Sequence, residues 1–305
     1  MEKIVMFHYF YDNKKYKKVQ GAISAQELEE LILSKKYKVI SAELWLTKYK
    51  DKKLEKNEIC FSFDDGLKEQ KEIALPILEK YKLKAIFNIN TYPTINEIDK
   101  LEIYRYYRNY YFGNVEEFYK TFFSYLEENF QDYKKNSELN DFSQYLIKSK
   151  FYSYNDRKFR YFRDVILKEK YYEIMDELIK KIQNLQEVKD KIWLKKEEIK
   201  NLSDLGHLIG LHTHTHPTNL DELTFSEQLE EFEQNKNILE EIIEKKIELV
   251  AYPCGKYNKD TFRCMNKLGI KFGLSATTKE NNYHNLLISR EDISDILDEI
   301  KVEIK

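Results

Sequence analysis

The sequence predicts an α/β fold built on a mainly parallel sheet, either a closed barrel or an open sheet. Two observations predict this class. Outside the middle of the chain, short apolar runs typical of strands alternate with amphipathic segments typical of helices, which is the pattern of β–α–β units. The length of 305 residues also fits an α/β barrel of about 200–250 residues that carries an insertion.

Seven apolar runs are predicted as strands, and amphipathic segments between them are predicted as helices. The strands are expected at residues 3–10, 37–41, 58–63, 84–90, 207–212, 247–253 and 271–276. The helices are expected at 24–36, 67–82, 194–205, 226–246 and 258–269. Gly206 and Gly269 stand where a helix C-terminal glycine belongs. Because chemistry in such folds collects at the carboxyl ends of strands, polar residues there are the candidate functional residues.

The stretch from about 97 to 190 has a different composition. It contains no proline, has Gly113 as its one glycine, and is crowded with Tyr, Phe, Lys and Glu. Its apolar residues recur at three-to-four spacing, as in Phe118, Phe122 and Leu126, which predicts helices. We therefore predict one domain over residues 1–305, interrupted by an all-helical insertion at about 97–190. Its aromatic residues are expected to form a core or an interface, with a lid over a functional site as the alternative.

The overall composition excludes several classes of protein. Lys+Arg 51 against Asp+Glu 53 gives a net charge of -2, so the chain offers no basic field for nucleic acid or anionic lipid. No run approaches the ~20 apolar residues that span a bilayer. The three cysteines form no Cys-x-x-Cys pair, and the first residues lack the apolar stretch of a secretory signal. A cytoplasmic protein with reduced thiols is expected.

The first strand end of interest carries two adjacent carboxylates. Asp64, Asp65 and Gly66 follow residues 58–63 directly, and Gly66 would allow a sharp backbone turn. One interpretation is a helix N-terminus, because Asp is favoured at the N-cap and acids suit the first turn. The other is a division of labour, in which one Asp binds a metal ion and the other acts as a base. This motif alone leaves both interpretations open.

The second strand end holds four of the six histidines, between residues 207 and 216. In an extended strand His212 and His216 would lie roughly 13 Å apart. On a helical turn the same spacing brings two side chains to about 5–6 Å, on one face. Both imidazoles could then reach a single Zn-like ion. His214 would point away from that face and is expected to support or pack, and His207 is expected to be structural.

Two histidines and one aspartate would make a three-ligand metal site with open positions. Open positions distinguish a catalytic metal from a structural one, which four protein ligands usually close. The ligand set suits one divalent ion, Zn²⁺ first, with Co²⁺, Ni²⁺, Fe²⁺ or Mn²⁺ also compatible. The third strand end, VAYPCGKYN at 250–258, is by itself an ordinary turn, and its interest comes from the other two.

Three segments together resemble a known family. FSFDDG (61–66) resembles the first motif of the NodB-type polysaccharide deacetylases, carbohydrate esterase family 4. IGLHTHTHP (209–217) resembles their His-x-x-x-His motif, and AYPCGKY (251–257) resembles their third, proline-containing loop. The flanking residues from Trp193 also match the surroundings of the second motif, and together the matches cover about two thirds of the chain, leaving 97–190 outside.

The resemblance implies a distorted (β/α) barrel, one NodB-like domain, and metal-dependent hydrolysis of an N-acetyl group on a sugar. Position by position, Asp64 matches the family's catalytic base and Asp65 its metal-binding aspartate. His212 and His216 match its metal histidines. The residue after the proline of the third motif, here Cys254, would donate its backbone N–H to the developing oxyanion.

The chain departs from the family pattern in two places. Family members usually end with a Leu-x-His motif whose histidine protonates the leaving amine, and nothing after residue 284 supplies it. IVMFHYF (4–10) is similar to the opening strand of circularly permuted members, so His8 is the general-acid candidate and His284 the fallback. The arginine of the third motif is also missing from AYPCG, and Arg290 is the candidate to orient Asp64 instead.

The resemblance therefore implies a hydrolase of carbon–nitrogen bonds other than peptide bonds. Its substrate would be an N-acetylated sugar, oligosaccharide or glycan precursor, and the sequence leaves the oligomeric state open. Three rivals are a hydrolase of a non-sugar linear amide, a non-catalytic glycan-binding protein, and a Mg²⁺-dependent phosphoryl-transfer enzyme. The last is disfavoured, because the chain lacks a glycine-rich phosphate loop and histidine ligands suit softer metals than Mg²⁺.

Overall fold

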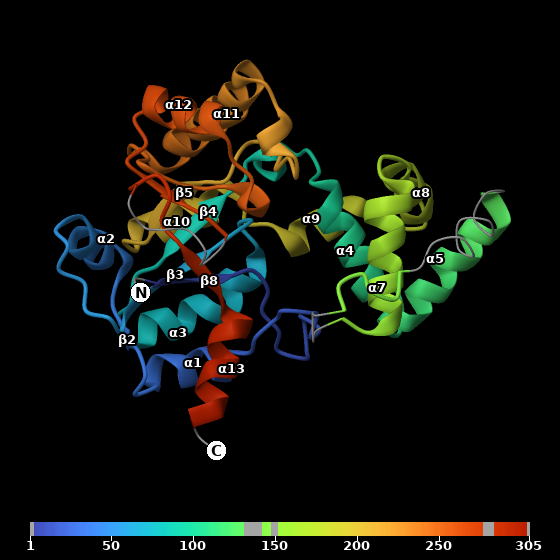
Figure 1. The fold of residues 1–305 in the computed structure, drawn as a ribbon, viewed down its shortest axis with the longest axis horizontal. Helices are drawn as coiled ribbons and strands as arrows, with labels where there is room; N and C mark the ends of the chain where they lie inside the picture. The colour runs from blue at the N-terminus through green and yellow to red at the C-terminus, as the bar shows by residue number, and fades with distance from the viewer. Residues whose placement is uncertain (1–2, 131–141, 148–151, 277–283, 304–305) are drawn as a thin grey trace. The chain divides into compact units, whose positions relative to one another are not determined.

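The computed structural model describes residues 3–130, 142–147, 152–276 and 284–303 (Figure 1). The contacts within the chain divide it into two compact units. The first consists of Met1–Asp99 and Lys189–Lys305, and the second of Lys100–Val188. The description of the whole chain as one NodB-like domain with an insertion at about 97–190 stays a prediction.

The first unit contains a sheet of eight strands, and every pair of neighbours in it is parallel. The order is β7-β6-β5-β4-β3-β1-β8, with β2 paired to β3 outside this path. The strands are β1 (Lys3–Phe7), β2 (Lys38–Val39), β3 (Glu58–Phe63), β4 (Ile86–Ile89), β5 (Leu208–Leu211), β6 (Leu249–Ala251), β7 (Phe272–Leu274) and β8 (Arg290–Asp292).

The segment that leads into β8 brings the two ends of this sheet together. Ile288 forms a parallel bridge with Leu274 of β7, and its N–H donates to the carbonyl of Gly273 at 2.7 Å. Two residues later, Arg290 pairs with Ile4 of β1. The strands therefore form a nearly closed parallel barrel surrounded by helices, as the NodB-type resemblance implies.

Helices surround the barrel of the first unit, with α1, α3 and α13 on one side of the strands and α11 and α12 on the opposite side in Figure 1. They are α1 (Ala25–Leu33), α2 (Ala42–Lys50), the π-helical η1 (Gln70–Ala74), α3 (Leu75–Lys80), the 3₁₀ turns η2 (Tyr92–Ile95), η4 (Leu220–Glu222) and η5 (Pro253–Gly255), α10 (Lys196–Asp204), α11 (Phe225–Ile243), α12 (Lys259–Leu268) and α13 (Ile293–Glu303).

Capping explains several of the helix boundaries. Ser24 and Thr224 each accept a hydrogen bond from the backbone N–H three residues on, and Glu27 and Glu227 return the bond, which forms two capping boxes. Gly269 ends α12 in the left-handed conformation, as its position predicted. A residue with a Cβ would be strained there.

The alternation along each strand sorts its residues onto two faces of the barrel wall. Phe7, Phe61, Phe63 and Phe87 belong to a buried cluster shared with the helices. The strand residues that alternate with this first set belong to a second buried cluster, to which most strands contribute: Ile4, Cys60, Ile86, Leu249, Ala251 and Leu274. This second face is the inside of the barrel. The same two-residue alternation, followed to the carboxyl ends of the strands, places four polar residues on this inner face: His8, Asp64, Asn88 and His212.

All seven predicted strands are present, although most are shorter than predicted, and β8, α2 and α13 were missed. The prediction for β3 was correct to the residue, because all six of its residues are buried and form one uninterrupted run. β8 has the sequence Arg-Glu-Asp and is three residues long, so no hydrophobic pattern in it predicts a strand. Its pairing with β1 is a product of barrel closure.

Among the described residues of the second unit, all the regular elements are helices. They form α4 (Lys100–Tyr110), α5 (Val115–Asn129), α7 (Tyr154–Tyr161), the π-helical η3 (Phe162–Leu167), α8 (Lys170–Ile179) and α9 (Leu185–Ile192), which ends in the first unit. Tyr107, Phe118, Phe122 and Phe159 are fully buried in a hydrophobic cluster of this unit's own. These aromatic residues therefore form a core, one of the two roles expected for them.

Among the described residues, none of the helices combines the length and the apolar character that a membrane span requires.

Candidate metal centre and active site

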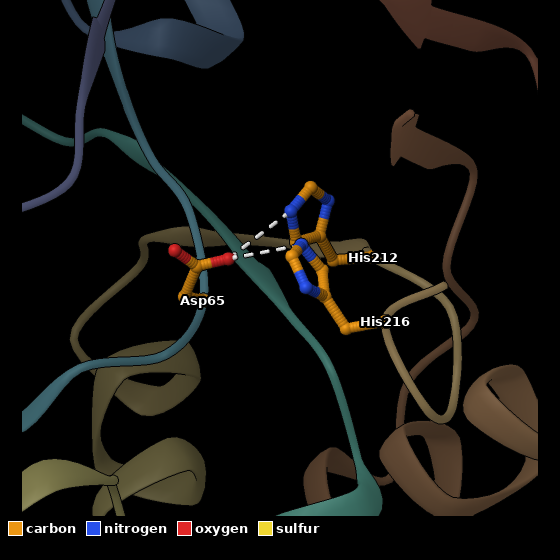
Figure 2. A group of neighbouring side chains, drawn as sticks. All are labelled: Asp65, His212 and His216. Atoms are coloured by element: carbon orange, nitrogen blue, oxygen red, sulfur yellow. Dashed lines mark ion pairs between the residues drawn. The ribbon is translucent and has the colours of Figure 1, made fainter. Parts of the chain in front are cut away.

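Asp65, His212 and His216 converge from two distant parts of the chain (Figure 2). Oδ1 of Asp65 lies 3.3 Å from Nε2 of His212 and 3.4 Å from Nε2 of His216. The two imidazole rings are 5.0 Å apart between centroids. Asp65 and His212 are buried, and His216 is nearly so. The tertiary structure thus brings together the three side chains that the sequence predicted as metal ligands.

The backbone route to this cluster differs from the expected helical turn. Residues 212–216 form an irregular loop after β5, in which Thr213 and His216 have positive φ angles of 64° and 59°. Each left-handed residue reverses the local direction of the chain, so the loop folds back and the two rings meet without a helix. Asp65 is also left-handed, with φ 74°, and three such residues at one site are unusual strain for side chains with a Cβ.

The outer nitrogen of each ring faces an acceptor. Nδ1 of His212 lies 2.8 Å from the carbonyl oxygen of Ala251, which can only accept, so the proton of the neutral ring sits on Nδ1. Nδ1 of His216 lies 3.5 Å from Oδ2 of Asp99, which is buried. Both rings therefore present the lone pair of Nε2 toward Asp65. Partners of this kind commonly orient metal-binding histidines.

The donor set fits a divalent cation. Oδ1 of Asp65 is buried and receives no hydrogen bond of good geometry from the described residues. Burial alone would raise the pKa of Asp65, but its electrostatic interactions with the neighbouring histidines, His212, His216 and His8, hold it well below the usual range. One carboxylate oxygen and two imidazole nitrogens, all within 4.8 Å of one another, form a set typical of Zn²⁺ and related ions.

Asp64, which also follows β3, has a different set of partners from Asp65. Its Oδ1 accepts hydrogen bonds from Nη1 of Arg290 and from Nδ2 of Asn88, both at 2.7 Å. Burial would raise the pKa of Asp64, but the charge and hydrogen bond of Arg290, with the charges of His212 and His8, lower it to about 2. Asp64 is therefore an ionised carboxylate at neutral pH, able to accept a proton, and Arg290 contacts it as the sequence suggested.

The two candidate general acids have different surroundings. His8 follows β1, and its Nε2 lies 3.9 Å from Oδ2 of Asp64, with 31% of the side chain exposed. Gln70 ties the two strand ends together, because its amide nitrogen donates to the carbonyls of both His8 and Asp64. Nδ1 of His284 instead accepts from the N–H of Leu286, and its ring lies against Phe262.

The remaining sequence-predicted residues are placed as follows. Cys254 lies in η5 after β6, with φ 53° and an exposed side chain, and the position of its N–H relative to a substrate stays a prediction. His214 is buried, with Nδ1 2.8 Å from the hydroxyl of Thr91 and its ring against Tyr92, in a supporting position as expected. His207 opens β5, where its Nδ1 accepts from the N–H of Ala85, and burial lowers its pKa to about 4.

Sequence reasoning missed two residues on α11 that form hydrogen bonds to the loop of residues 212–216, called the histidine loop below. Glu231 accepts from the N–H groups of His214 and Thr215 at 2.9 and 2.8 Å. Asn235, one turn later, accepts from the N–H of His212 at 3.0 Å and donates to a carbonyl at the end of β4. Both are polar residues on the buried side of an amphipathic helix, and that position was the available signal.

Asn88 and Asp99 were also missed. Asn88 lies in a strand that was predicted, and its place in the two-residue alternation puts it on the same face as Asp64. Asp99 lies in the polar segment after β4, at a carboxyl end of the sheet where functional residues are expected. Neither residue lies in a segment that resembles a known motif. Their positions relative to β4 were the signal that could have identified them.

This chain has a parallel-strand barrel with two histidines and a pair of aspartates at the carboxyl ends of its strands. This is the arrangement expected of a NodB-type protein. The family model described as polysaccharide deacetylase matches residues 168–273. Together with this fold, the match shows that the chain contains a polysaccharide deacetylase domain of the NodB type, carbohydrate esterase family 4. Membership of the circularly permuted subgroup stays a prediction.

Individual relatives agree with this assignment. The chain is 28% identical over 83 residues to YxkH of Bacillus subtilis (strain 168), a proposed polysaccharide deacetylase, a match that spans 27% of this chain and 29% of that protein. The Streptococcus pyogenes deacetylase PplD, solved in complex with acetate, has a TM-score of 0.57 at 16% identity, over 95% of this chain and 91% of that chain. IcaB from Ammonifex degensii also gives 0.57, at 13% identity, over 99% and 97% of the two chains. At these identities the solved structures show the fold alone.

Proposed function

We propose that this protein is a metal-dependent hydrolase that removes the acetyl group from an N-acetylated sugar, oligosaccharide or glycan precursor. The observation that carries the proposal is the division of the Asp64–Asp65 pair. Asp65 faces two histidine nitrogens, whereas Asp64 faces Arg290, Asn88 and His8. One carboxylate is thereby available to a cation and the other to a proton. The reaction class of the family and the acetate held by PplD support the same chemistry.

Asp65, His212 and His216 would hold one divalent ion, with Zn²⁺ the first candidate. When bound, such an ion acts as a Lewis acid that polarises an amide carbonyl and makes water more acidic. This contribution matters here, because a carboxylate whose pKa is about 2 is a weak base by itself.

Two side chains of the chain would then move protons. Hydrolysis forms a bond from water oxygen to the acyl carbon and breaks the bond from that carbon to nitrogen. Asp64 accepts the proton that the attacking water gives up, and His8, as imidazolium, donates a proton to the departing amine. Their 3.9 Å separation lets both face one reacting group. The backbone N–H of Cys254 is our candidate donor to the developing oxyanion.

The substrate would be carbohydrate, and the place of action is proposed to be the cytoplasm, where a glycan precursor would be the acetylated substrate. A carbohydrate substrate follows from the family. The cytoplasmic location is proposed from the three sparse cysteines, which form no Cys-x-x-Cys pair.

Purified protein is expected to release acetate from at least one member of a panel of N-acetylated sugars, oligosaccharides and sugar nucleotides. Release should stop with a chelator and return when Zn²⁺, Co²⁺, Ni²⁺ or Mn²⁺ is added back, because three ligands present open positions. Acetate is measured enzymatically in each arm. Glycan binding without acetate release, in protein carrying one stoichiometric metal ion, would reject the proposal in favour of a glycan-binding protein.

Replacing His8 with Asn is expected to lower kcat by about 10²–10⁴-fold, because the amine would then leave without its proton donor. His284→Asn removes the competing candidate and should leave kcat within about twofold of wild type. Both variants are assayed with the most active member of the panel. A large loss in the His284 variant, with His8→Asn near wild type, would reverse the assignment.

A further inference from the structure

Asn88 contacts Asp64 from outside the three segments that carry the family resemblance. It is fully buried in β4, and its Nδ2 donates to Oδ1 of Asp64 at 2.7 Å. The opposite orientation of the amide would place two oxygens at that distance, so the donor must face the carboxylate. This leaves Oδ1 of Asn88 buried without a hydrogen bond from the described residues. An unsatisfied buried carbonyl destabilises the fold, so this placement is a cost that the contact to Asp64 offsets.

The barrel makes room for this orientation at one position. Gly210 is the register partner of Asn88 on β5. A Cβ at residue 210 would come within 2.2 Å of Oδ1 of Asn88 and 2.6 Å of a methyl group of Leu249. The absence of a side chain at Gly210 therefore leaves space for Oδ1 of Asn88, so that Nδ2 can face Asp64 at the end of the other neighbouring strand, β3.

The consequence for Asp64 is an asymmetry between its two oxygens. Oδ1 accepts from Arg290 and from Asn88, and these two donors occupy both of its lone pairs. Oδ2 is the oxygen that faces His8. With Arg290 alone, the carboxylate could still turn about its last bond, because that torsion is broad. A second donor from a different strand removes this freedom.

We propose that Asn88 is a positioning residue for the catalytic carboxylate: with Arg290 it holds Oδ1 of Asp64, and this leaves Oδ2 as the oxygen that accepts the proton. The inference rests on the proposed deacetylase function for its kinetic test. The orientation of the Asp64 carboxylate can also be tested without any measurement of activity.

The kinetic test compares two buried amides that are each replaced by leucine. Asn88→Leu is expected to lower kcat by about 10- to 100-fold, the effect of losing a hydrogen bond to a charged group. KM and the stoichiometry of bound Zn²⁺ should stay within about twofold of wild type. The control is Gln228→Leu, between α11 and α12, where Nε2 donates to the carbonyl of Leu223 and Oε1 accepts from Thr261. Because both ends of Gln228 are satisfied, its loss should lower the unfolding temperature more than Asn88→Leu does, with kcat unchanged.

A crystal structure of Asn88→Leu supplies the second readout. The carboxylate plane of Asp64 is expected to rotate, so that Oδ1 and Oδ2 no longer keep their separate partners. An unrotated carboxylate, or a kcat loss that follows the fall in unfolding temperature in both variants, would overturn the inference. If wild-type protein released no acetate from any substrate, the proposed function would fail, and the orientation of Asp64 in the variant would still decide the role of Asn88.

Discussion

Replacing Asp64 with Asn is expected to lower the rate of acetate release by about 10²–10⁴-fold while one metal ion per chain stays bound. In the proposed mechanism Asp64 accepts the proton of water, and proton transfer of this kind contributes a factor of that size. The substitution leaves Asp65, His212 and His216 in place. Acetate release and metal content measured on the same preparation test both halves of this expectation.

The same substitution has an effect on stability that must be measured beside it. Arg290 is 1% exposed, and its guanidinium faces the carboxylate of Asp64. An uncompensated buried charge costs about 3–5 kcal/mol, so the unfolding temperature should fall. Assays below that temperature separate lost chemistry from lost fold. Turnover near the wild-type rate in folded Asp64→Asn protein would reject Asp64 as the base.

Replacing Asp65 with Ala is expected to abolish both activity and stoichiometric metal binding. Oδ1 of Asp65 lies 3.3 Å and 3.4 Å from the two histidine nitrogens, and without it two imidazoles remain as ligands. A ligand that binds only the folded state stabilises it, by about 2.7 kcal/mol at a hundredfold excess over Kd. Zn²⁺ should therefore raise the unfolding temperature of wild type and leave that of Asp65→Ala unchanged.

The matched control for this experiment removes a histidine that lies outside the cluster. His284 is exposed, and its ring lies against Phe262, so His284→Asn should keep the full Zn²⁺-dependent shift. An equal shift in Asp65→Ala and wild type would show that Zn²⁺ binds elsewhere, and the assignment of the three ligands would then be wrong.

Several parts of this site could be predicted because their signals are local. The run of six buried residues in β3 marks a strand, and Asp64 and Asp65 stand directly at its end. His212 and His216 lie at the end of another predicted strand. In a parallel barrel all carboxyl ends face the same way, so strand-end residues meet whatever their separation in sequence. The predicted ligand set and the predicted base follow from this rule together with the family resemblance.

The conformation of the histidine loop was not predictable in the same way. A spacing of four residues is typical of a helical turn, yet Thr213 and His216 are left-handed and the loop is irregular. That conformation is stabilised from outside, by Glu231 and Asn235 on a helix that begins nine residues after the loop. Local propensity does not contain these contacts.

The amino-acid sequence by itself determined the class of fold, the strand ends that carry chemistry, and the pair of aspartates with two histidines. Tertiary structure added partners that the sequence had not indicated, and it decided how Arg290, a candidate from the sequence, reaches Asp64. Arg290 reaches Asp64 because β8, a strand with no hydrophobic signal, pairs with β1. Asn88 reaches Asp64 because Gly210 on the neighbouring strand leaves space for it. The physical reason is that strand pairing brings Arg290 to Asp64 over 226 positions and places Gly210 beside Asn88, and local propensity contains neither contact.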